Sequence, residues 1–248
     1  VGTIKTEPIG IIDSKYYSFV PGSGYQQIET IQPGKGYWVK VKQSGIIILS
    51  SAGNHCPGTP AVEYAGKTYN TVQIGTQCWL RENLDVGTMI QGIDTLKNNG
   101  IIEKYCYNND TNNCNTYGAL YQWDEAMQYT TTAGTRGICP PDWHIPTYFE
   151  FQTLSTTVGG NGNALKEIGQ GAGPGAGTNT SGFSALLSGY RYYPGAFYGL
   201  GDGTPFWSST ENDTDGACSM GLGYGGSDIG VYYYSYKGGG LSVRCVKD

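Results

Sequence analysis

Seven cysteines are spread along this chain of 248 residues, at positions 56, 78, 106, 114, 139, 218 and 245. None belongs to a CxxC pair, and the two histidines, His55 and His144, cannot complete a zinc site of the usual spacing. Disulfide bonds made in an oxidising compartment explain these cysteines better than free buried thiols in the cytosol. We therefore expect a cross-linked extracellular or cell-surface protein, in which the odd count leaves at least one cysteine unpaired within the chain.

Glycine (40 residues) and tyrosine (21 residues) are far more frequent than in an average protein, whereas charged residues make up only 14% of the chain. Most of the polarity therefore comes from hydroxyl and amide side chains, a balance typical of turn-rich β structure. Intrinsic disorder requires few aromatic residues and a high net charge, but aromatic residues reach 13% and the formal net charge is -5. We expect the chain to fold.

The charge and hydropathy patterns argue against two classes of partner. Lysines and arginines are scattered singly in an acidic chain, so we expect no nucleic-acid partner. We also expect no membrane insertion, since the longest aliphatic run, Ile46 to Leu49, is far shorter than the roughly 18 residues of a spanning helix. The start at Val1, without Met, suggests a mature or trimmed piece of an exported precursor.

Residues 1–50 have the pattern of a small β module. Residues 25–31 and 36–41 alternate between apolar and polar side chains, and the turn-forming residues 33–36 between them predict a β-hairpin. Ile46 to Leu49 would add the third strand of a meander. Residues 51–61 are rich in glycine and proline and are predicted to be a linker, so the main domain spans residues 62–248.

Two helices are predicted in the main domain. Leucine, tryptophan and methionine recur at helical spacing within Tyr117 to Tyr129, with Gln122, Glu125 and Gln128 on another face. The second helix begins after Thr147, which can form a capping box with the residue at position 150, and it ends by the glycines at 159 and 160.

Short strands and one flexible loop complete the expected organisation. The glycine-rich stretch from 159 to 182 is predicted to be a surface loop. The glycines at 238–240 predict a hairpin between the last two strands. The predicted strands are 62–64 and 67–74, which form a hairpin around Ala65-Gly66, and 77–80, 183–187, 206–209, 217–222, 229–236 and 241–246.

Six separated segments carry a family resemblance. In chain order they are YNTVQIGTQCWLRENLD, YCYNNDTNNCNTYGALYQWDEAM, GICPPDWHIPT, GFSALLSGYR, FWSST and LSVRCVKD. Together they closely resemble the Fibrobacter succinogenes major paralogous domain, from about Thr68 to Asp248. The segment IQPGKGYWVKVKQSGIIIL before them resembles a truncated small β module of bacterial secreted proteins.

The resemblance implies a loop-rich α+β fold of the C-type-lectin-like class, with two helices and twisted antiparallel sheets, related to formylglycine-generating enzymes. Those enzymes use a close pair of active cysteines with copper. Here the only close pair, Cys106 and Cys114, lies in an Asn- and Asp-rich segment with only Lys104 as a nearby cation, which indicates a small disulfide staple. His144 is interpreted as a structural residue, and no nucleophile elbow, P-loop or HExxH motif occurs. We therefore expect no enzymatic activity.

Spacing alone does not determine which cysteines pair. The working assignment joins Cys56 with Cys78, Cys106 with Cys114, and Cys139 with Cys245, and leaves Cys218 unpaired. In an alternative assignment Cys218 pairs with Cys78, and Cys56 is free to bond to another chain.

No cofactor is expected, although calcium is a weak possibility because C-type-lectin relatives often bind it through clustered oxygens. Glu211, Asp213 and Asp215, with Asn212, form one candidate group. A second group consists of Asn108, Asn109, Asp110 and Asn113. Polar turns explain both groups better, since neither has a fixed ligand spacing.

Tyrosines, glycines and serines gather in the C-terminal part, the chemistry of recognition loops that bind with few charges. The predicted ligand-binding residues are Tyr190, Tyr192, Tyr193, Tyr198, Trp207, Tyr224, Tyr232, Tyr233, Tyr234 and Tyr236. Alternatively, every second tyrosine of the last long strand faces the core. We expect a binding or adhesion protein for a surface glycan or protein. The alternative is a structural subunit of a filament or coat, assembled from copies of the chain by β-strand addition through the N-terminal module.

Overall fold

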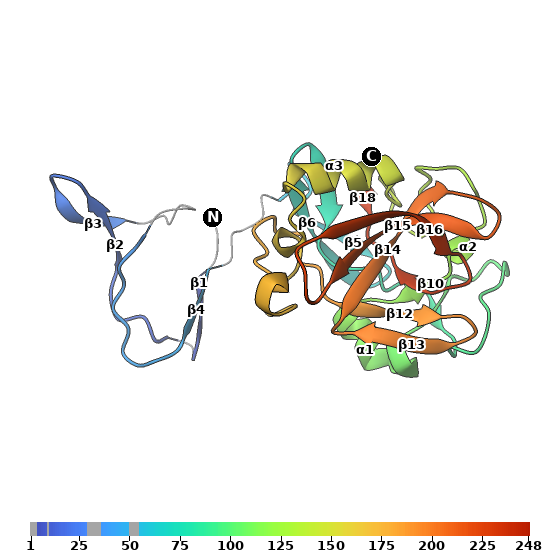
Figure 1. Ribbon diagram of the computed structural model, residues 1–248, viewed down its shortest axis with the longest axis horizontal. Coiled ribbons are helices and arrows are strands. Elements are labelled where there is room, and N and C mark those ends of the chain that lie inside the picture. Colours follow the sequence, from blue (N-terminus) through green and yellow to red (C-terminus); the bar gives the residue numbers. More distant parts are fainter. Residues whose placement is uncertain (1–3, 9, 29–35, 50–54) are drawn as a thin grey trace. The chain divides into compact units, whose positions relative to one another are not determined.

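The computed structural model of the protein describes residues 4–8, 10–28, 36–49 and 55–248. The chain divides into two compact units, Val1–Ala52 and Gly53–Asp248 (Figure 1). Within the described ranges no helix is long and apolar enough to cross a bilayer.

The first unit contains two separate pairs of antiparallel strands. β2 (Tyr16–Val20) and β3 (Gly24–Ile28) form a hairpin, and β1 (Ile4–Glu7) pairs with β4 (Ile46–Leu49). The turn of the hairpin contains Gly22, whose φ of 84° lies in the left-handed region that glycine adopts without strain.

The three-stranded meander predicted for this unit is wrong, although a strand does form at Ile46–Leu49. β3 pairs with the preceding strand, and residues 36–41 contribute only single bridges such as that between Tyr17 and Trp38. β4 pairs with a strand about 40 residues away, which a local turn signal cannot indicate. Turn residues 33–35 lie outside the described part of the chain.

Two five-stranded sheets form the second unit, one with the order β10-β17-β14-β15-β16 and the other with the order β11-β18-β7-β6-β5 (Figure 1). All neighbours are antiparallel except β14 and β17, which are parallel. The strands of the first sheet are β10 (Leu120–Tyr121), β14 (Gly203–Glu211), β15 (Gly216–Gly223), β16 (Ile229–Tyr236) and β17 (Leu241–Ser242). The strands of the second are β5 (Ala61–Tyr64), β6 (Lys67–Ile74), β7 (Gln77–Leu80), β11 (Trp143–His144) and β18 (Val246–Lys247).

Two further strand pairs and three short 3-10 helices lie outside these sheets. β12 (Ser188–Tyr192) and β13 (Ala196–Leu200) form a hairpin, and β8 (Thr88–Met89) runs parallel to β9 (Glu103–Lys104). The 3-10 helices are η1 (Tyr107–Asn109), η2 (Gly162–Ala164) and η3 (Gly173–Gly175).

Strands with local signals form where the sequence predicts them. The hairpin of β5 and β6 turns at Ala65 and Gly66, both of which have positive φ, and the predicted strands at 77–80 and 229–236 match β7 and β16. Residues 183–187 form no strand and contribute only an isolated bridge between Ala185 and Lys166.

The hairpin predicted at the C-terminal end is wrong. β16 pairs with β15 at the edge of its sheet, whereas β17 lies between β10 and β14. Arg191 holds the segment between β16 and β17 in place. Its backbone exchanges hydrogen bonds with Gly240, and its guanidinium donates to the carbonyl of Gly238 (2.8 Å). The predicted strand at 241–246 is divided between β17 and β18, which belong to different sheets.

Three α-helices form in the described residues, where two are predicted. The second predicted helix is confirmed as α3 (Tyr148–Thr157), with the capping box between Thr147 and Glu150 in place. Phe151 and Leu154 are buried, as expected for its inner face.

The predicted helix over 117–129 is wrong. Gly118, with a φ of 81°, ends α1 (Thr111–Tyr117), Leu120 and Tyr121 pair with β17, and only α2 (Trp123–Ala126) is helical. Gln122 and Glu125 are buried with hydrogen-bond partners, so they do not form an exposed polar face. α1 is missing from the prediction, although its N-cap Asp110 accepts a hydrogen bond from the backbone of residue 112.

The core of the second unit is rich in aromatic rings. Beside α3, Trp79 stacks on Phe151 with ring centroids 5.7 Å apart and meets Phe183 edge-on. A second buried cluster contains Trp123 and Trp207 together with cysteine side chains. Burying one large apolar side chain contributes about 1.5–3 kcal/mol, so each of these rings adds substantially to the stability of the unit.

The working disulfide assignment is confirmed: Cys56–Cys78, Cys106–Cys114 and Cys139–Cys245 are bonded, and Cys218 is a buried free thiol. The alternative pairing of Cys218 with Cys78 is therefore wrong. Because Cys56 is bonded to β7, residues 55–60, which composition assigns to the linker, pack as part of the second unit.

Candidate functional site

The predicted tyrosines lie on the β12–β13 hairpin, on β16 and on the turn before β16. Tyr190 is half-buried. The exposed ones are Tyr192, Tyr193, Tyr198, Tyr224, Tyr232, Tyr233, Tyr234 and Tyr236.

The assignment of Trp207 as a ligand-binding residue is wrong. Its side chain is completely buried, and its indole N–H donates to the carbonyl of Tyr121 (2.7 Å). Trp207 lies on β14, in the middle of the five-stranded sheet, with its ring in the core cluster that holds the Cys139–Cys245 disulfide.

The tyrosines of β16 divide between two faces, because successive side chains of a strand point in opposite directions. On one face Tyr233 stacks on Tyr148 of α3, with ring centroids 4.4 Å apart. Tyr232 and Tyr234 belong to the other face. The alternative that every second tyrosine of this strand faces the core is wrong, since all four tyrosines of β16 are exposed and Tyr233, which stacks on Tyr148, is 64% exposed.

Glycines under these rings are a steric requirement. A Cβ atom at Gly216 would lie 2.2 Å from the ring of Tyr234, and one at Gly230 would lie 2.2 Å from the ring of Tyr232. Any larger residue would push the rings off the sheet, so glycine and tyrosine together form this surface.

A groove of about 770 Å³ is lined by Tyr190 and Tyr232. Two carboxylates, those of Asp202 and Asp228, also line it. Both are exposed and can accept hydrogen bonds. Most of the remaining wall is backbone, supplied by Gly199, Gly203, Gly221, Gly223, Gly226 and Gly230.

One wall of the groove is held by a buried lysine. Lys166 is fully buried, and its ammonium donates to the carbonyls of Gly223 (2.7 Å), Gly226 (2.8 Å) and Gly175. These contacts tie the glycine-rich loop around η3 to the turn that lines the groove. The loop therefore has a defined structure, which its composition does not predict. Burial lowers the pKa of the Lys166 ammonium.

Sequence reasoning missed the two carboxylates, the glycine wall and Lys166. A usable signal exists, because each aspartate stands in a glycine-spaced segment next to one tyrosine-bearing strand, GLGDG at 199–203 after β13 and GLGYGGSDIG at 221–230 before and into β16. No comparable signal marks Lys166, whose carbonyl partners are 9, 57 and 60 residues away.

The calcium candidates are engaged in turns and caps. Asp213 accepts from the backbone of Asp215 (2.9 Å) and Gly216 (2.7 Å), and Glu211 forms an ion pair with Lys237. In the second group, the Asp110 side chain caps α1. Over the described ranges, no three His, Cys, Asp or Glu side chains gather in a way that could hold a metal ion.

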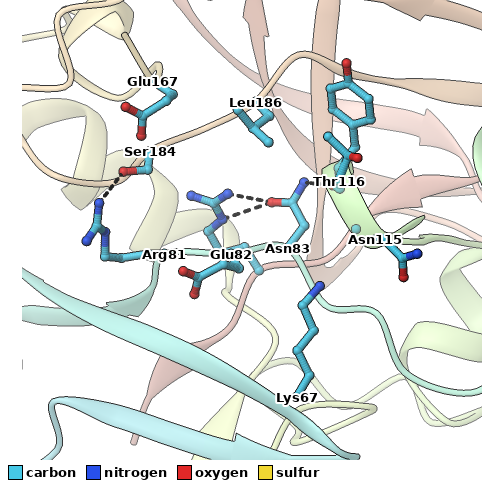
Figure 2. A pocket seen from close by; sticks show the side chains of 12 residues that line it. Lys67, Arg81, Glu82, Asn83, Asn115, Thr116, Glu167, Ser184 and Leu186 are labelled. Atoms are coloured by element: carbon cyan, nitrogen blue, oxygen red, sulfur yellow. Dashed lines mark hydrogen bonds between the residues drawn. The ribbon is translucent and has the colours of Figure 1, made fainter. Parts of the chain in front are cut away.

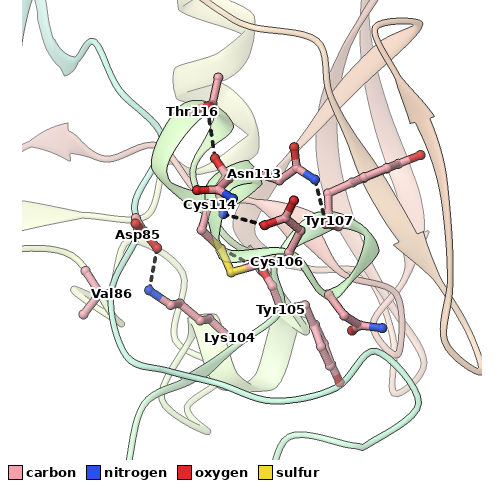
Figure 3. The surroundings of a disulfide bond; sticks show 12 residues. Asp85, Val86, Lys104, Tyr105, Cys106, Tyr107, Asn113, Cys114 and Thr116 are labelled. Carbon is pink, nitrogen blue, oxygen red and sulfur yellow. Dashed lines mark hydrogen bonds and ion pairs between the residues drawn. A yellow bond between two sulfur atoms is a disulfide. The ribbon is translucent and has the colours of Figure 1, made fainter.

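The close cysteine pair forms a disulfide that joins η1 to α1, and Lys104 beside it forms a 2.5 Å ion pair with Asp85 (Figure 3). The free thiol of Cys218 is buried, and burial raises its pKa, so the protonated, unreactive form is favoured.

His144 lies between two carboxylates. Its Nδ1 is 2.6 Å from Asp248 and its Nε2 is 2.9 Å from Glu150, the capping residue of α3. Burial lowers the pKa of His144, but the hydrogen bonds to Glu150 and Asp248 outweigh it and raise the pKa above the ordinary value. The three groups clamp β11 and the start of α3 to the end of the chain.

The family model of the Fibrobacter succinogenes major domain matches residues 72–247. No curated protein and no solved structure shows a significant match. The matched region contains both five-stranded sheets apart from β5 and the start of β6, and it includes all residues of the groove. The chain belongs to the Fibrobacter succinogenes major domain family.

Proposed function

We propose that the protein is a secreted or cell-surface binding protein without catalytic activity, which recognises a glycan or a protein through the tyrosine groove. We further propose that its α+β fold is C-type-lectin-like. The groove of about 770 Å³ with Tyr190 and Tyr232 at its walls is the observation that carries the proposal.

The chemistry of the groove suits a glycan best. A tyrosine ring offers a flat apolar surface to the C–H face of a sugar, and its hydroxyl adds a hydrogen bond at low entropic cost. Asp202 and Asp228 can accept hydrogen bonds from sugar hydroxyls, and the glycines leave backbone N–H and C=O groups accessible.

The proposed location outside the cytoplasm rests on the disulfides. Three bonds in a chain of this size are typical of an oxidising environment and would be reduced by cytosolic thiols. Isolation of the native protein with all six of these cysteines reduced would contradict this location.

The binding test compares two neighbouring tyrosines. Tyr232→Ala removes a groove wall, whereas Tyr233→Ala removes a ring of the same type and similar exposure from the opposite face. After a glycan array has identified a ligand, calorimetry should show binding at least about tenfold weaker for Tyr232→Ala and unchanged for Tyr233→Ala. Equal affinities for wild type and Tyr232→Ala would refute the groove as the binding site.

A structural subunit of an extracellular filament or coat is the second candidate. It is favoured by the position of β16, which is the last strand of its sheet and leaves one row of backbone groups for a strand of another molecule. Addition through the N-terminal module is the other route. Analytical ultracentrifugation at micromolar concentration tests both routes, since a strictly monomeric protein would contradict assembly.

A further inference from the structure

A second, smaller pocket of about 250 Å³ shares no lining residue with the tyrosine groove. Three cationic side chains line it: Lys67, Arg81 and Arg244. Figure 2 shows Lys67 and Arg81 coming from different segments, Lys67 pointing toward Asn83 and Arg81 toward Ser184. With the carboxylates of Glu82 and Glu167, which also line it, the pocket combines three positive and two negative side chains in a chain with few charged residues.

Arg244 is the most deeply buried of the three, with 1% of its surface exposed. Its Nε and one terminal nitrogen donate to the Oδ1 of Asn83 (3.0 and 2.6 Å), and the other terminal nitrogen donates to the carbonyl of Phe183. These acceptors are all uncharged. These bonds use three of its five N–H groups, and the guanidinium lies over the rings of Phe183 (4.2 Å) and Phe206 (5.3 Å).

Burial of this cation next to neutral acceptors has an energetic cost. Removal from water lowers the pKa of the Arg244 guanidinium to about 9, because the charged form loses its hydration and the carboxylates of Glu82 and Glu167 offset only part of this loss. A negative charge entering the pocket would offset that loss, and a guanidinium binds a carboxylate with particular strength because its parallel N–H groups match the two oxygens.

The other two cations also have little carboxylate contact. Arg81 donates to the carbonyl of Gly182 (3.1 Å) and to the hydroxyl of Ser184 (2.9 Å), both neutral. Lys67 lies 4.0 Å from Asp85, whose closer partner is Lys104 at 2.5 Å.

Two glutamates at the pocket limit which anion it can accept. Both oxygens of Glu82 accept hydrogen bonds from Asn70 (2.7 and 2.9 Å), and the oxygens of Glu167 accept from the backbone of Ile168 (3.2 Å) and the amide of Asn179 (2.8 Å). These charges repel a doubly charged anion such as phosphate. Their remaining lone pairs can accept hydrogen bonds from ligand hydroxyls.

We infer that this pocket binds a singly charged, hydroxyl-bearing carboxylate, a hexuronate. Its carboxylate contacts the guanidinium groups of Arg81 and Arg244, with the ammonium of Lys67 as the third positive charge that attracts it, and its hydroxyls contact the side chains of Glu82 and Glu167. The site is independent of the tyrosine groove and adds recognition of acidic sugars to the chain.

The test is a calorimetric titration of the full chain with D-glucuronate, with D-glucose as the neutral sugar of the same ring and inorganic phosphate as the second anion. Glucuronate should bind, and glucose and phosphate should bind at least about tenfold more weakly. Absence of glucuronate binding at millimolar concentrations, or equal binding of glucose or phosphate, overturns the inference.

Variants locate the site. Arg81→Gln and Lys67→Gln should each weaken glucuronate binding by about tenfold, whereas Lys97→Gln, an exposed lysine that does not line the pocket, should leave it unchanged. Circular dichroism checks that each variant is folded. Tyr232→Ala should not alter glucuronate binding, which separates this site from the tyrosine groove. Unchanged affinity in both Arg81→Gln and Lys67→Gln would refute the pocket as the site.

Discussion

Removing the disulfide between Cys139 and Cys245 should destabilise the fold far more than removing the disulfide between Cys106 and Cys114. All four sulfur-bearing side chains are at most 2% exposed, so replacing either pair by alanine removes similar buried surface. The two bonds differ mainly in sequence separation, which is 106 residues for the first and 8 for the second.

The magnitude follows from the entropy of the unfolded chain. A disulfide that closes a loop lowers the entropy of the unfolded chain and so raises the free energy of unfolding. At room temperature this contribution is about 4.8 kcal/mol for the loop of 106 residues and about 2.5 kcal/mol for the loop of 8. The Cys56–Cys78 bond, with a separation of 22, should fall between them at about 3.4 kcal/mol. The double variants Cys139→Ala/Cys245→Ala and Cys106→Ala/Cys114→Ala should therefore differ in free energy of unfolding by about 2.3 kcal/mol.

Guanidinium denaturation followed by tryptophan fluorescence, without reductant, measures this difference. Each double variant is compared with wild type, and circular dichroism confirms that it retains native secondary structure. A smaller loss for Cys139→Ala/Cys245→Ala than for Cys106→Ala/Cys114→Ala, or equal losses, would show that loop entropy does not set the order.

Three further outcomes are expected. Because the pKa of His144 is raised in the folded state, protonated His144 stabilises the folded protein fully below pH 6.5, and this contribution is lost as pH rises through the folded-state pKa. Because the pKa of Glu150 is lowered, ionised Glu150 stabilises the folded protein above pH 4.5, and this contribution is lost as pH falls through its folded-state pKa. The melting temperature of wild type should therefore peak between these values, and His144→Gln should flatten the alkaline side of the profile. Lys166→Met should lower the free energy of unfolding by about 2 kcal/mol, because the carbonyls of Gly175, Gly223 and Gly226 lose their donor, and limited proteolysis should then cut the loop around η3. Trp207→Ala should cost about 3–5 kcal/mol in denaturant titration, as expected for a core residue.

Features whose signals are local in sequence could be predicted. The start of α3 was predictable because Thr147 and Glu150 satisfy each other's backbone donors within four residues. The β5–β6 hairpin was predictable because Ala65-Gly66 joins two alternating segments. The disulfides could be predicted as a class from the cysteine content, and their pairing agreed with the working assignment.

Features that depend on distant partners could not be predicted. The glycines at 238–240 allow a hairpin, but the backbone of Arg191 pairs with Gly240 and directs the chain to the other side of β14. Leu120 fits a helical pattern equally well until its pairing with β17 is known. Trp207 stands on a strand whose sequence does not reveal which face meets the core.

The candidate site also has features that the sequence predicts and features that depend on residues distant in the chain. Composition alone directs attention to the tyrosines, because their frequency is a property of the sequence. Asp202 and Asp228 line one groove only because β15 pairs with both β14 and β16 in the folded sheet. The small cationic pocket could not be predicted from the sequence, since two of its cations, Lys67 and Arg244, are far apart in the chain.

The ammonium of Lys166 supplies the wall of the groove with a cation that is covalently part of the chain. A metal ion held by the same carbonyls would leave when a chelator arrived or when the surrounding water became poor in that metal. A lysine is bonded to the chain and cannot dissociate, so we expect these contacts to persist in the presence of a chelator. Its vulnerability is instead to alkali, since burial lowers the pKa of the ammonium and a neutral amine has only two N–H donors for three carbonyls.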